Sequence, residues 1–546
     1  MTPASLSAAA LHDALTAADR GERELAPIDV REEGVFGAAH LLRAVNLPLS
    51  RLELWLRALI PRKSAPIVLM DDADGLAERA AQVMALAGYT DLSILEGGVA
   101  AWAAAGYELF SGVNVPSKVF GEYVEHRFGT PHLSAQELKA KLDAREDLVI
   151  LDSRPMAEYR LMNIPGGVDA PGAELVWRVR ALAPDARTTV VVNCAGRTRS
   201  IIGAQSLINA GLENPVFALK NGTMGWHLAG FALERGESRQ APAPDAEAQA
   251  WAKRAARRVA ERFRAPAVTP AELERMQRET DRTTYLLDVR DPAEFEAGRP
   301  RGARNAPGGQ LVQATDRYVG VLGARIVLVD AEQVRAPMTA SWLIQMGWPE
   351  VYVLDGGVEA FGEALESGPA RPCVPELEHF AQSFIDADAL AELGDDVPIL
   401  DLSTSLQHKR GHVPGARFAA RVSLADDLGA LANARLIVLT ATDERTARLA
   451  ANDLTQRGVH RVRVLRGGLA GWRAAGRPIE TGLKNPLSDP DRDVYERPYD
   501  LEDGVEAAMQ AYLDWEIELI RQIERDGTLT FPDFAPDPGA RAPADA

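Results

Sequence analysis

Residues 189–194 read TVVVNC, a run rich in β-branched side chains that ends at a cysteine. A short apolar run of this kind, bounded by turn-forming residues, is typical of a buried strand in a parallel sheet. Three similar runs occur elsewhere: PIVLMD at 66–71, RIVLVD at 325–330 and LIVLTA at 436–441. We call the last residue of each run its marker, and the four markers are Asp71, Cys194, Asp330 and Ala441.

A second apolar run precedes each marker at a nearly constant distance. These runs read APIDVR at 26–31, LVILDSR at 148–154, YLLDVR at 285–290 and VPILDLS at 397–403. Their aspartates precede the marker by 42 positions in the first three copies and by 40 in the fourth. After each marker, a helical pattern ends 17 positions later in a glycine, which suits the left-handed C-cap of a helix. The four glycines are Gly88, Gly211, Gly347 and Gly458.

Signals that recur in one register predict a tandem repeat. Strands alternating with helices at this pitch need right-handed crossovers, which give a parallel sheet with helices on both faces. The predicted fold class is α/β, with four such domains at 5–112, 130–238, 266–368 and 385–480 and a C-terminal helical tail at 481–546. The tail should contain a helix over 505–527 and a disordered end. Its helix should pack on the body or on a second copy of the chain, so the sequence allows a homodimer.

The composition limits the classes of partner. The net charge of −18 argues against a nucleic-acid partner, because phosphate contacts need a basic face. The chain shows neither a long apolar stretch nor a leader-like start, so we expect a soluble cytoplasmic protein without a membrane partner. Its two cysteines cannot form a disulfide framework, and no metal-ligand spacing or nucleotide-binding glycine motif occurs, so no metal and no other cofactor is predicted.

Only the second copy follows its marker with a loop suited to anions. The loop reads Cys194-Ala195-Gly196-Arg197-Thr198-Arg199-Ser200. It lies where parallel sheets bind ligands, at the carboxyl end of a strand, and its small residues let backbone N–H groups converge beside a helix N-terminus. A cysteine there should be largely a thiolate. Arg197 and Arg199 should bind the oxygens of an anionic substrate, and Ser200 stands where the N-cap of the helix is expected.

Each of these assignments has an alternative. Cys194 could be a small buried hydrophobe at a strand end, and the two arginines alone could be surface charges. Cys373, in RPCVPE at 371–376, lies between two domains without a glycine loop. It could relay sulfur from Cys194 or be an incidental linker thiol.

The residues of the second copy resemble the rhodanese family. CAGRTRS resembles the family's Cys-x-x-x-x-Arg-Ser active-site loop, and LDSRPMAEYRLMNIPGGVDAP at 151–171 resembles its Asp-x-Arg…Glu-Tyr…Ile-Pro-Gly stretch. The resemblance implies that a small anionic donor such as thiosulfate passes sulfane sulfur to Cys194, and that cyanide, a thiol or an acceptor protein collects it. Asp152 and Arg154 match the Asp-x-Arg element, where they brace the pocket or form a structural ion pair.

The other three copies should be inactive. Their loops read DDADGLAER, DAEQVRAPM and ATDERTARL, which lack a thiol and place acidic residues at a site meant for anions. They are expected to support the second domain, shape its entrance or recruit a partner. Two alternatives to a sulfurtransferase remain: a persulfide carrier or scaffold without turnover, and a cysteine-dependent phosphatase. Such phosphatases usually place five residues between cysteine and arginine, whereas four separate Cys194 from Arg199.

Overall fold

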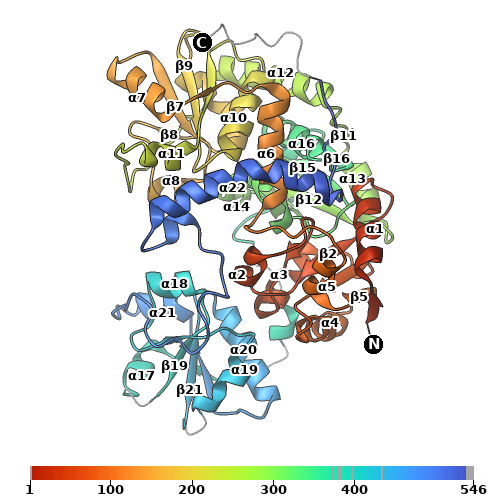
Figure 1. Cartoon of the computed structure of the whole chain (residues 1–546), viewed down its shortest axis with the longest axis vertical. Coiled ribbons are helices and arrows are strands. Elements are labelled where there is room, and N and C mark those ends of the chain that lie inside the picture. The colour runs from red at the N-terminus through yellow and green to blue at the C-terminus, as the bar shows by residue number, and fades with distance from the viewer. Residues whose placement is uncertain (1–2, 371–373, 379–382, 395–396, 432–433, 536–546) are drawn as a thin grey trace.

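Four five-stranded sheets, each built of parallel strands, form the framework of the chain (Figure 1). The computed structural model describes residues 3–370, 374–378, 383–394, 397–431 and 434–535. Cys373 and the end of the tail, 536–546, therefore lie outside the described residues. The expected α/β class with helices flanking parallel sheets is confirmed.

The first two repeats contain these elements. The first has β1 (Ala4–Leu6), β2 (Ala26–Asp29), β3 (Val45–Asn46), β4 (Ile67–Met70), β5 (Leu92–Leu95), α1 (Ala8–Asp19), α2 (Glu33–Ala38), α3 (Leu52–Leu59), α4 (Leu76–Leu86) and α5 (Gly98–Ala104). The second has β6 (His132–Leu133), β7 (Leu148–Asp152), β8 (Val168–Asp169), β9 (Thr189–Asn193), β10 (Val216–Leu219), α7 (Ala135–Asp143), α8 (Met156–Leu161), α9 (Leu175–Leu182), α10 (Thr198–Asn209) and α11 (Gly222–Leu228). Helix α6 (Val115–Phe128) connects them, and α12 (Ala246–Arg262) leads to the third repeat.

The remaining repeats follow the same order. The third has β11 (Ala267–Val268), β12 (Thr284–Asp288), β14 (Arg304–Asn305), β15 (Arg325–Val329), β16 (Glu350–Leu354), α13 (Pro270–Arg278), α14 (Pro292–Ala297), α15 (Gly308–Gln313), α16 (Arg335–Gln345) and a short antiparallel pair, β13 (Arg299–Pro300) with β17 (Leu365–Glu366). The fourth has β18 (Phe384–Ile385), β19 (Ile399–Asp401), β20 (Arg417–Phe418), β21 (Ile437–Thr440), β22 (Val462–Leu465), α17 (Ala387–Ala391), α18 (Ser405–Arg410), α19 (Leu424–Asp427), α20 (Glu444–Gln456) and α21 (Gly468–Ala474).

Each marker follows the central strand of its sheet. The strand orders are β1-β5-β4-β2-β3, β6-β10-β9-β7-β8, β11-β16-β15-β12-β14 and β18-β22-β21-β19-β20. All four glycines predicted at helix C-termini have positive φ, between 74° and 91°, as a left-handed cap requires. The carboxyl end of β9 therefore presents Cys194 at the sheet edge where a following helix begins.

The first three repeats share one hydrophobic core, and the fourth has its own. Leu69, Val190 and Ile326, from the first three central strands, belong to one continuous cluster, whereas Leu439 of β21 lies in a separate one. In Figure 1 the fourth repeat lies at the bottom, and it contacts the first repeat through Leu449 with Leu54 and Arg421 with Glu53. The fourth repeat is thus an appended unit rather than part of the shared core.

The tail helix α22 (Val505–Asp526) packs on its own chain. Leu519 lies in a cluster with Val115 and Val119 of α6, and Leu513 lies in a cluster with Met224 of α11. Figure 1 shows α22 crossing α6 in the middle of the molecule. The first of the two expected arrangements, packing on the body, is therefore the one found. Within the described part of the chain, no helix combines the length and apolarity that crossing a bilayer requires.

Candidate active site

Cys194 lies between β9 and α10, at the turn where the central strand of the second sheet gives way to a helix. Its side chain is buried, and the residue is 2% exposed. The sulfur Sγ lies 3.6 Å from Ser200 Oγ. The thiol therefore faces the first turn of α10 rather than bulk solvent.

Ser200 does not cap that helix, so the expected N-cap was wrong. Helix α10 begins at Thr198 with Arg197 at the N-cap, and no side chain accepts a capping hydrogen bond there. Ser200 lies in the first turn, where its hydroxyl donates to the carbonyl of Arg197 at 2.7 Å. The N-cap therefore lies three residues earlier than expected, within the loop that follows Cys194.

The repeats with an aspartate at the marker show where those amides point. In the third repeat, the carboxylate of Asp330 accepts hydrogen bonds from the backbone N–H groups of Gln333, Val334 and Ala336, at 3.0, 2.8 and 3.0 Å. Asp71 likewise accepts from two backbone amides of its own loop, at 2.9 and 3.0 Å. The loop after a central strand is thus an N–H cradle that holds an anionic group at the marker position.

The same positions of the second repeat are filled by residues of the predicted loop. Counting from the marker as in the third repeat, the equivalent amides belong to Arg197, Thr198 and Ser200. Here the marker is Cys194, whose side chain carries no charge as a thiol. In the second repeat, an ionised sulfur of Cys194 would supply the negative charge that the carboxylate of Asp330 supplies in the third repeat.

Arg197 fastens the loop to α6. Its Nε and Nη2 donate to the two oxygens of Glu122 at 2.6 and 2.8 Å, and Nη2 also contacts Glu125 at 2.5 Å. Nη1 donates to Asn221 at 3.2 Å. Burial raises the pKa of Glu122 although Arg197 opposes that shift. With two carboxylates around it, the Arg197 charge is largely compensated, so its role toward substrate stays a prediction.

Arg199 pairs with a carboxylate that was assigned no role from the sequence. Its Nη1 and Nη2 donate to Glu158 of α8 at 3.0 and 2.7 Å, and Nη1 also donates to Gln310 of the third repeat at 3.2 Å. Burial opposes ionisation of Glu158, but the charge and hydrogen bonds of Arg199 outweigh it and hold the pKa of Glu158 at about 2. Arg199 thus links α10 to α8 and α15.

Asp152 and Arg154 form a buried ion pair at the end of β7. Arg154 Nε and Nη2 donate to the Asp152 carboxylate at 2.8 and 2.6 Å, and Nη2 also donates to the carbonyl of Met162. The pairs Asp29–Arg31 and Asp288–Arg290 have the same geometry in repeats without a thiol. This recurrence favours the structural alternative for the pair.

A cavity of about 110 Å³ opens beside Cys194. Of the predicted site residues, 194–199 line it, whereas Ser200, Asp152 and Arg154 do not. Its other walls come from α8 and α11 of the second repeat, from α6 and the segment before it, from α15 and the segment after it, and from the tail. These further lining residues are Val113, Asn114, Lys118, Glu158, Met224, Gln310, Gln313, Ala314, Arg317, Tyr495, Arg497, Pro498, Tyr499 and Tyr512. The third repeat and the tail thus enclose a site whose thiol belongs to the second repeat.

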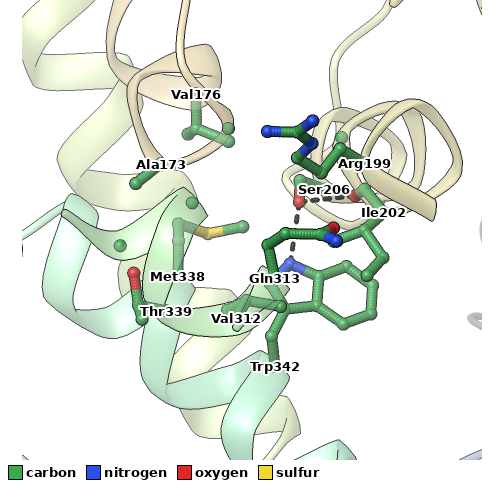
Figure 2. Close-up of a pocket in the computed structure, with 14 residues that line it drawn as sticks. Ala173, Val176, Arg199, Ile202, Ser206, Val312, Gln313, Met338, Thr339 and Trp342 are labelled. Atoms are coloured by element: carbon green, nitrogen blue, oxygen red, sulfur yellow. Dashed lines mark hydrogen bonds between the residues drawn. The ribbon is translucent and has the colours of Figure 1, made fainter. Parts of the chain in front are cut away.

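The second and third repeats meet at a seam next to this cavity. Arg199 and Gln313 line both the cavity and a small void of about 30 Å³ at the seam, which Figure 2 shows in close-up. Trp342 Nε1 donates across the seam to Ser206 Oγ at 2.8 Å. Such a void has room for little more than a water molecule, so it is a packing feature.

Sequence reasoning missed the tail side chains, Lys118 and Glu158 as parts of this site. No local pattern signals that α22 and the segment before it return to the second repeat, because that depends on how the repeats pack. Among the described residues, no group of three or more His, Cys, Asp or Glu side chains is placed to hold a metal ion. The proposed relay through Cys373 falls outside the described residues.

Comparison with known proteins agrees with this architecture. The family model of the rhodanese-like domain matches residues 10–105, 134–229, 269–364 and 386–475. The chain therefore belongs to the rhodanese family.

One solved structure is similar over nearly the whole chain. It is a thiosulfate sulfurtransferase from Pseudomonas aeruginosa, 48% identical, covering 98% of this chain and 100% of that one, with a TM-score of 0.91. Two Bacillus subtilis (strain 168) proteins match shorter parts. The uncharacterized protein YqhL is 35% identical over 86 residues, which are 16% of this chain and 67% of that protein. The putative sulfur carrier protein YrkF is 25% identical over 124 residues, which are 21% of this chain and 66% of that protein.

Proposed function

We propose that this chain is a sulfurtransferase that moves sulfane sulfur through a persulfide on Cys194. The observation that carries the proposal is the N–H cradle. In two inert repeats it holds a carboxylate, and in the second repeat a cysteine stands at the same position. Converging amides and a helix N-terminus stabilise a thiolate and, after sulfur transfer, the negative terminal sulfur of a persulfide. The similarity to a thiosulfate sulfurtransferase over 98% of the chain supports the same chemistry.

The reaction has two steps. Cys194 Sγ attacks the outer sulfur of thiosulfate, a new S–S bond forms, and the S–S bond of thiosulfate breaks with its electron pair leaving on sulfite. Cyanide or a thiolate then attacks the terminal sulfur of the persulfide. The persulfide bond breaks, its electron pair returns to Cys194 Sγ, and thiocyanate or a new persulfide departs.

The enclosure of the thiol favours small donors and acceptors. Cys194 is 2% exposed and lies at a cavity of about 110 Å³ whose walls come from the second and third repeats, from α6 with the segment before it, and from the tail. The thiol of a folded partner protein does not reach such a position without a rearrangement of the tail. A small anionic donor with cyanide or a low-molecular-weight thiol as acceptor fits the cavity better than an acceptor protein does.

A matched set of variants tests the proposal. The full-length protein is incubated with thiosulfate, the mass gain of one sulfur atom is located by peptide mass spectrometry, and its loss to cyanide or glutathione is timed. We expect a persulfide on Cys194 and multiple turnovers. Cys194→Ser should lose activity by at least about 10³-fold, while Cys373→Ser should keep it.

The outcomes also separate the alternatives. A stoichiometric Cys194 persulfide with little turnover would identify a carrier, and hydrolysis of phosphate esters in place of sulfur transfer would identify a phosphatase. Full activity of Cys194→Ser would remove the proposed mechanism. Loss of activity in Cys373→Ser would revive the relay.

A further inference from the structure

Among the residues that the structure describes, five cationic side chains line the cavity next to Cys194, and carboxylates compensate four of them. Arg197 contacts Glu122 and Glu125, and Arg199 contacts Glu158. The two other compensated cations are Lys118, 3.1 Å from Glu516, and Arg317, 3.0 Å from Glu33. A cation already paired with a carboxylate has little net attraction left for a substrate anion.

Arg497 differs from these four. Its Nη1 donates to the phenol oxygen of Tyr499 at 3.1 Å, and its guanidinium lies 5.9 Å from the centre of the same ring. Within the described ranges, no carboxylate oxygen lies within 4.0 Å of its guanidinium nitrogens. Among the described residues, Arg497 is therefore the cation on the cavity wall that no carboxylate contacts directly, and the charge of Glu158 acts on it only through space.

The segment that carries Arg497 is held in place from two sides. The carboxylate of Asp493 accepts from the backbone N–H and the hydroxyl of Ser405, at 2.7 and 2.6 Å. Glu496 pairs with Lys409 of α18 at 2.8 Å. On the other side, α22 packs on α6 directly after the segment. The fourth repeat thus anchors the segment whose Arg497 lines the cavity beside the thiol of the second repeat.

We propose that Arg497 is the anion-binding residue of the donor site, and that the fourth repeat acts by positioning it. This inference rests on the proposed function, because it names how that site recognises its donor. A planar guanidinium binds two oxygens of a sulfonate group at once, which suits thiosulfate before the transfer and sulfite after it. The neighbouring residues Tyr495, Tyr499 and Tyr512 contribute hydroxyl groups, which attract an anion less strongly than the guanidinium of Arg497 does.

Substitution of Arg497 tests the assignment by two independent readouts. The first is steady-state sulfur transfer from thiosulfate to cyanide. Arg497→Gln should raise the KM for thiosulfate about tenfold or more, as expected for the loss of a charge-assisted hydrogen bond. Arg497→Lys should recover part of that loss. Arg492→Gln, which removes an exposed charge five residues earlier in the same segment, should leave the KM unchanged.

The second readout does not require sulfur transfer. Cys194 is alkylated with anionic iodoacetate and with neutral iodoacetamide, and the modified peptide is quantified by mass spectrometry. In Arg497→Gln the rate with iodoacetate should fall several-fold relative to the rate with iodoacetamide. This ratio remains measurable even if the chain transfers no sulfur from thiosulfate, so failure of the proposed function and failure of this inference are distinguishable.

Two results would overturn the inference. One is an unchanged KM together with an unchanged ratio of the two alkylation rates. The other is an equal change of both alkylation rates in Arg497→Gln, since that would show that Arg497 only closes the cavity. Thermal unfolding of each variant checks that the tail remains packed.

Discussion

Asp169 occupies in the second repeat the position that Asn305 occupies in the third. Each lies 17 positions after the aspartate that ends the preceding sheet strand. The Asn305 amide donates to the carbonyls of Asp288 and Arg290, at 3.3 and 2.9 Å. The carboxylate of Asp169 is buried, and neither of its oxygens has a hydrogen-bond partner in the described structure.

Asp169→Asn should therefore stabilise the protein above neutral pH. Burial, together with the nearby charge of Asp152, raises the pKa of Asp169 to about 7. In the unfolded chain it ionises near 4, so between about pH 4 and pH 7 folding retains a proton and stability falls as pH rises. The asparagine removes this loss and gains the donor bonds of Asn305. We expect the stabilisation to be about 4 kcal/mol larger at pH 8 than at pH 4, measured by urea unfolding at both pH values; an equal effect at both would contradict the titration.

Cys194→Asp should abolish sulfur transfer while leaving the repeat folded. Asp71 and Asp330 show that the loop accommodates a carboxylate at the marker position. The new carboxylate would accept hydrogen bonds from backbone N–H groups of the loop, as Asp330 does in the third repeat, so we expect a gain in stability of about 1 kcal/mol. Calorimetry gives the unfolding temperatures of this variant and of Cys194→Ser, and so compares a charged with a neutral side chain at position 194. A lower unfolding temperature for the aspartate would mean that the cradle of the second repeat differs from the other two.

Glu158→Gln should destabilise the protein near neutral pH but not in acid. The pKa of Glu158 is about 2 because of Arg199. Since the unfolded carboxyl ionises near 4.5, the ionised pair contributes stability above that pH and loses it as pH falls toward 2. The difference corresponds to about 3 kcal/mol at pH 7. Chemical denaturation of both proteins from pH 7 to pH 3 should show the gap closing with acidity, and a gap independent of pH would refute the ion-pair explanation.

Gly222→Ala should disturb the Cys194 loop directly. Gly222 has φ +55°, and an added Cβ would collide with the carbonyl oxygen of Cys194 and lie 2.6 Å from that of Gly196. Gly230→Ala is the matched control, because Gly230 has φ +82° and open space around it. The control should lose only about 1 kcal/mol of stability, which is the cost of placing an alanine in the left-handed conformation. Gly222→Ala should lose clearly more stability and most of its alkylation rate at Cys194; equal effects in the two variants would exclude the steric account.

The repeat architecture was readable from the sequence because it depends on local signals. Strand runs that end at the markers and glycines 17 positions later recur in one register, and the glycines have the left-handed conformation that this position needs. Local preference failed at Ser200. Serine favours an N-cap, but the N-cap of α10 is Arg197, three residues earlier.

The electrostatic part of the site could not be predicted in the same way. Arg197 meets Glu122 across 75 positions of sequence, and Arg199 meets Gln310 across 111. Neither spacing follows a helix or strand period, since both depend on how α6 and the third repeat pack against the second. The arginines looked like substrate ligands because their compensating partners lie far away in the chain.

The place of Arg497 in the cavity wall has a consequence for biosynthesis. The ribosome adds this residue roughly 300 positions after Cys194, which at ordinary elongation rates takes about 15–60 s. Throughout that interval the emerging polypeptide carries the thiol without the wall that encloses it. If Arg497 binds the donor as proposed, the donor pocket is completed only after the segment that carries this residue has been synthesised.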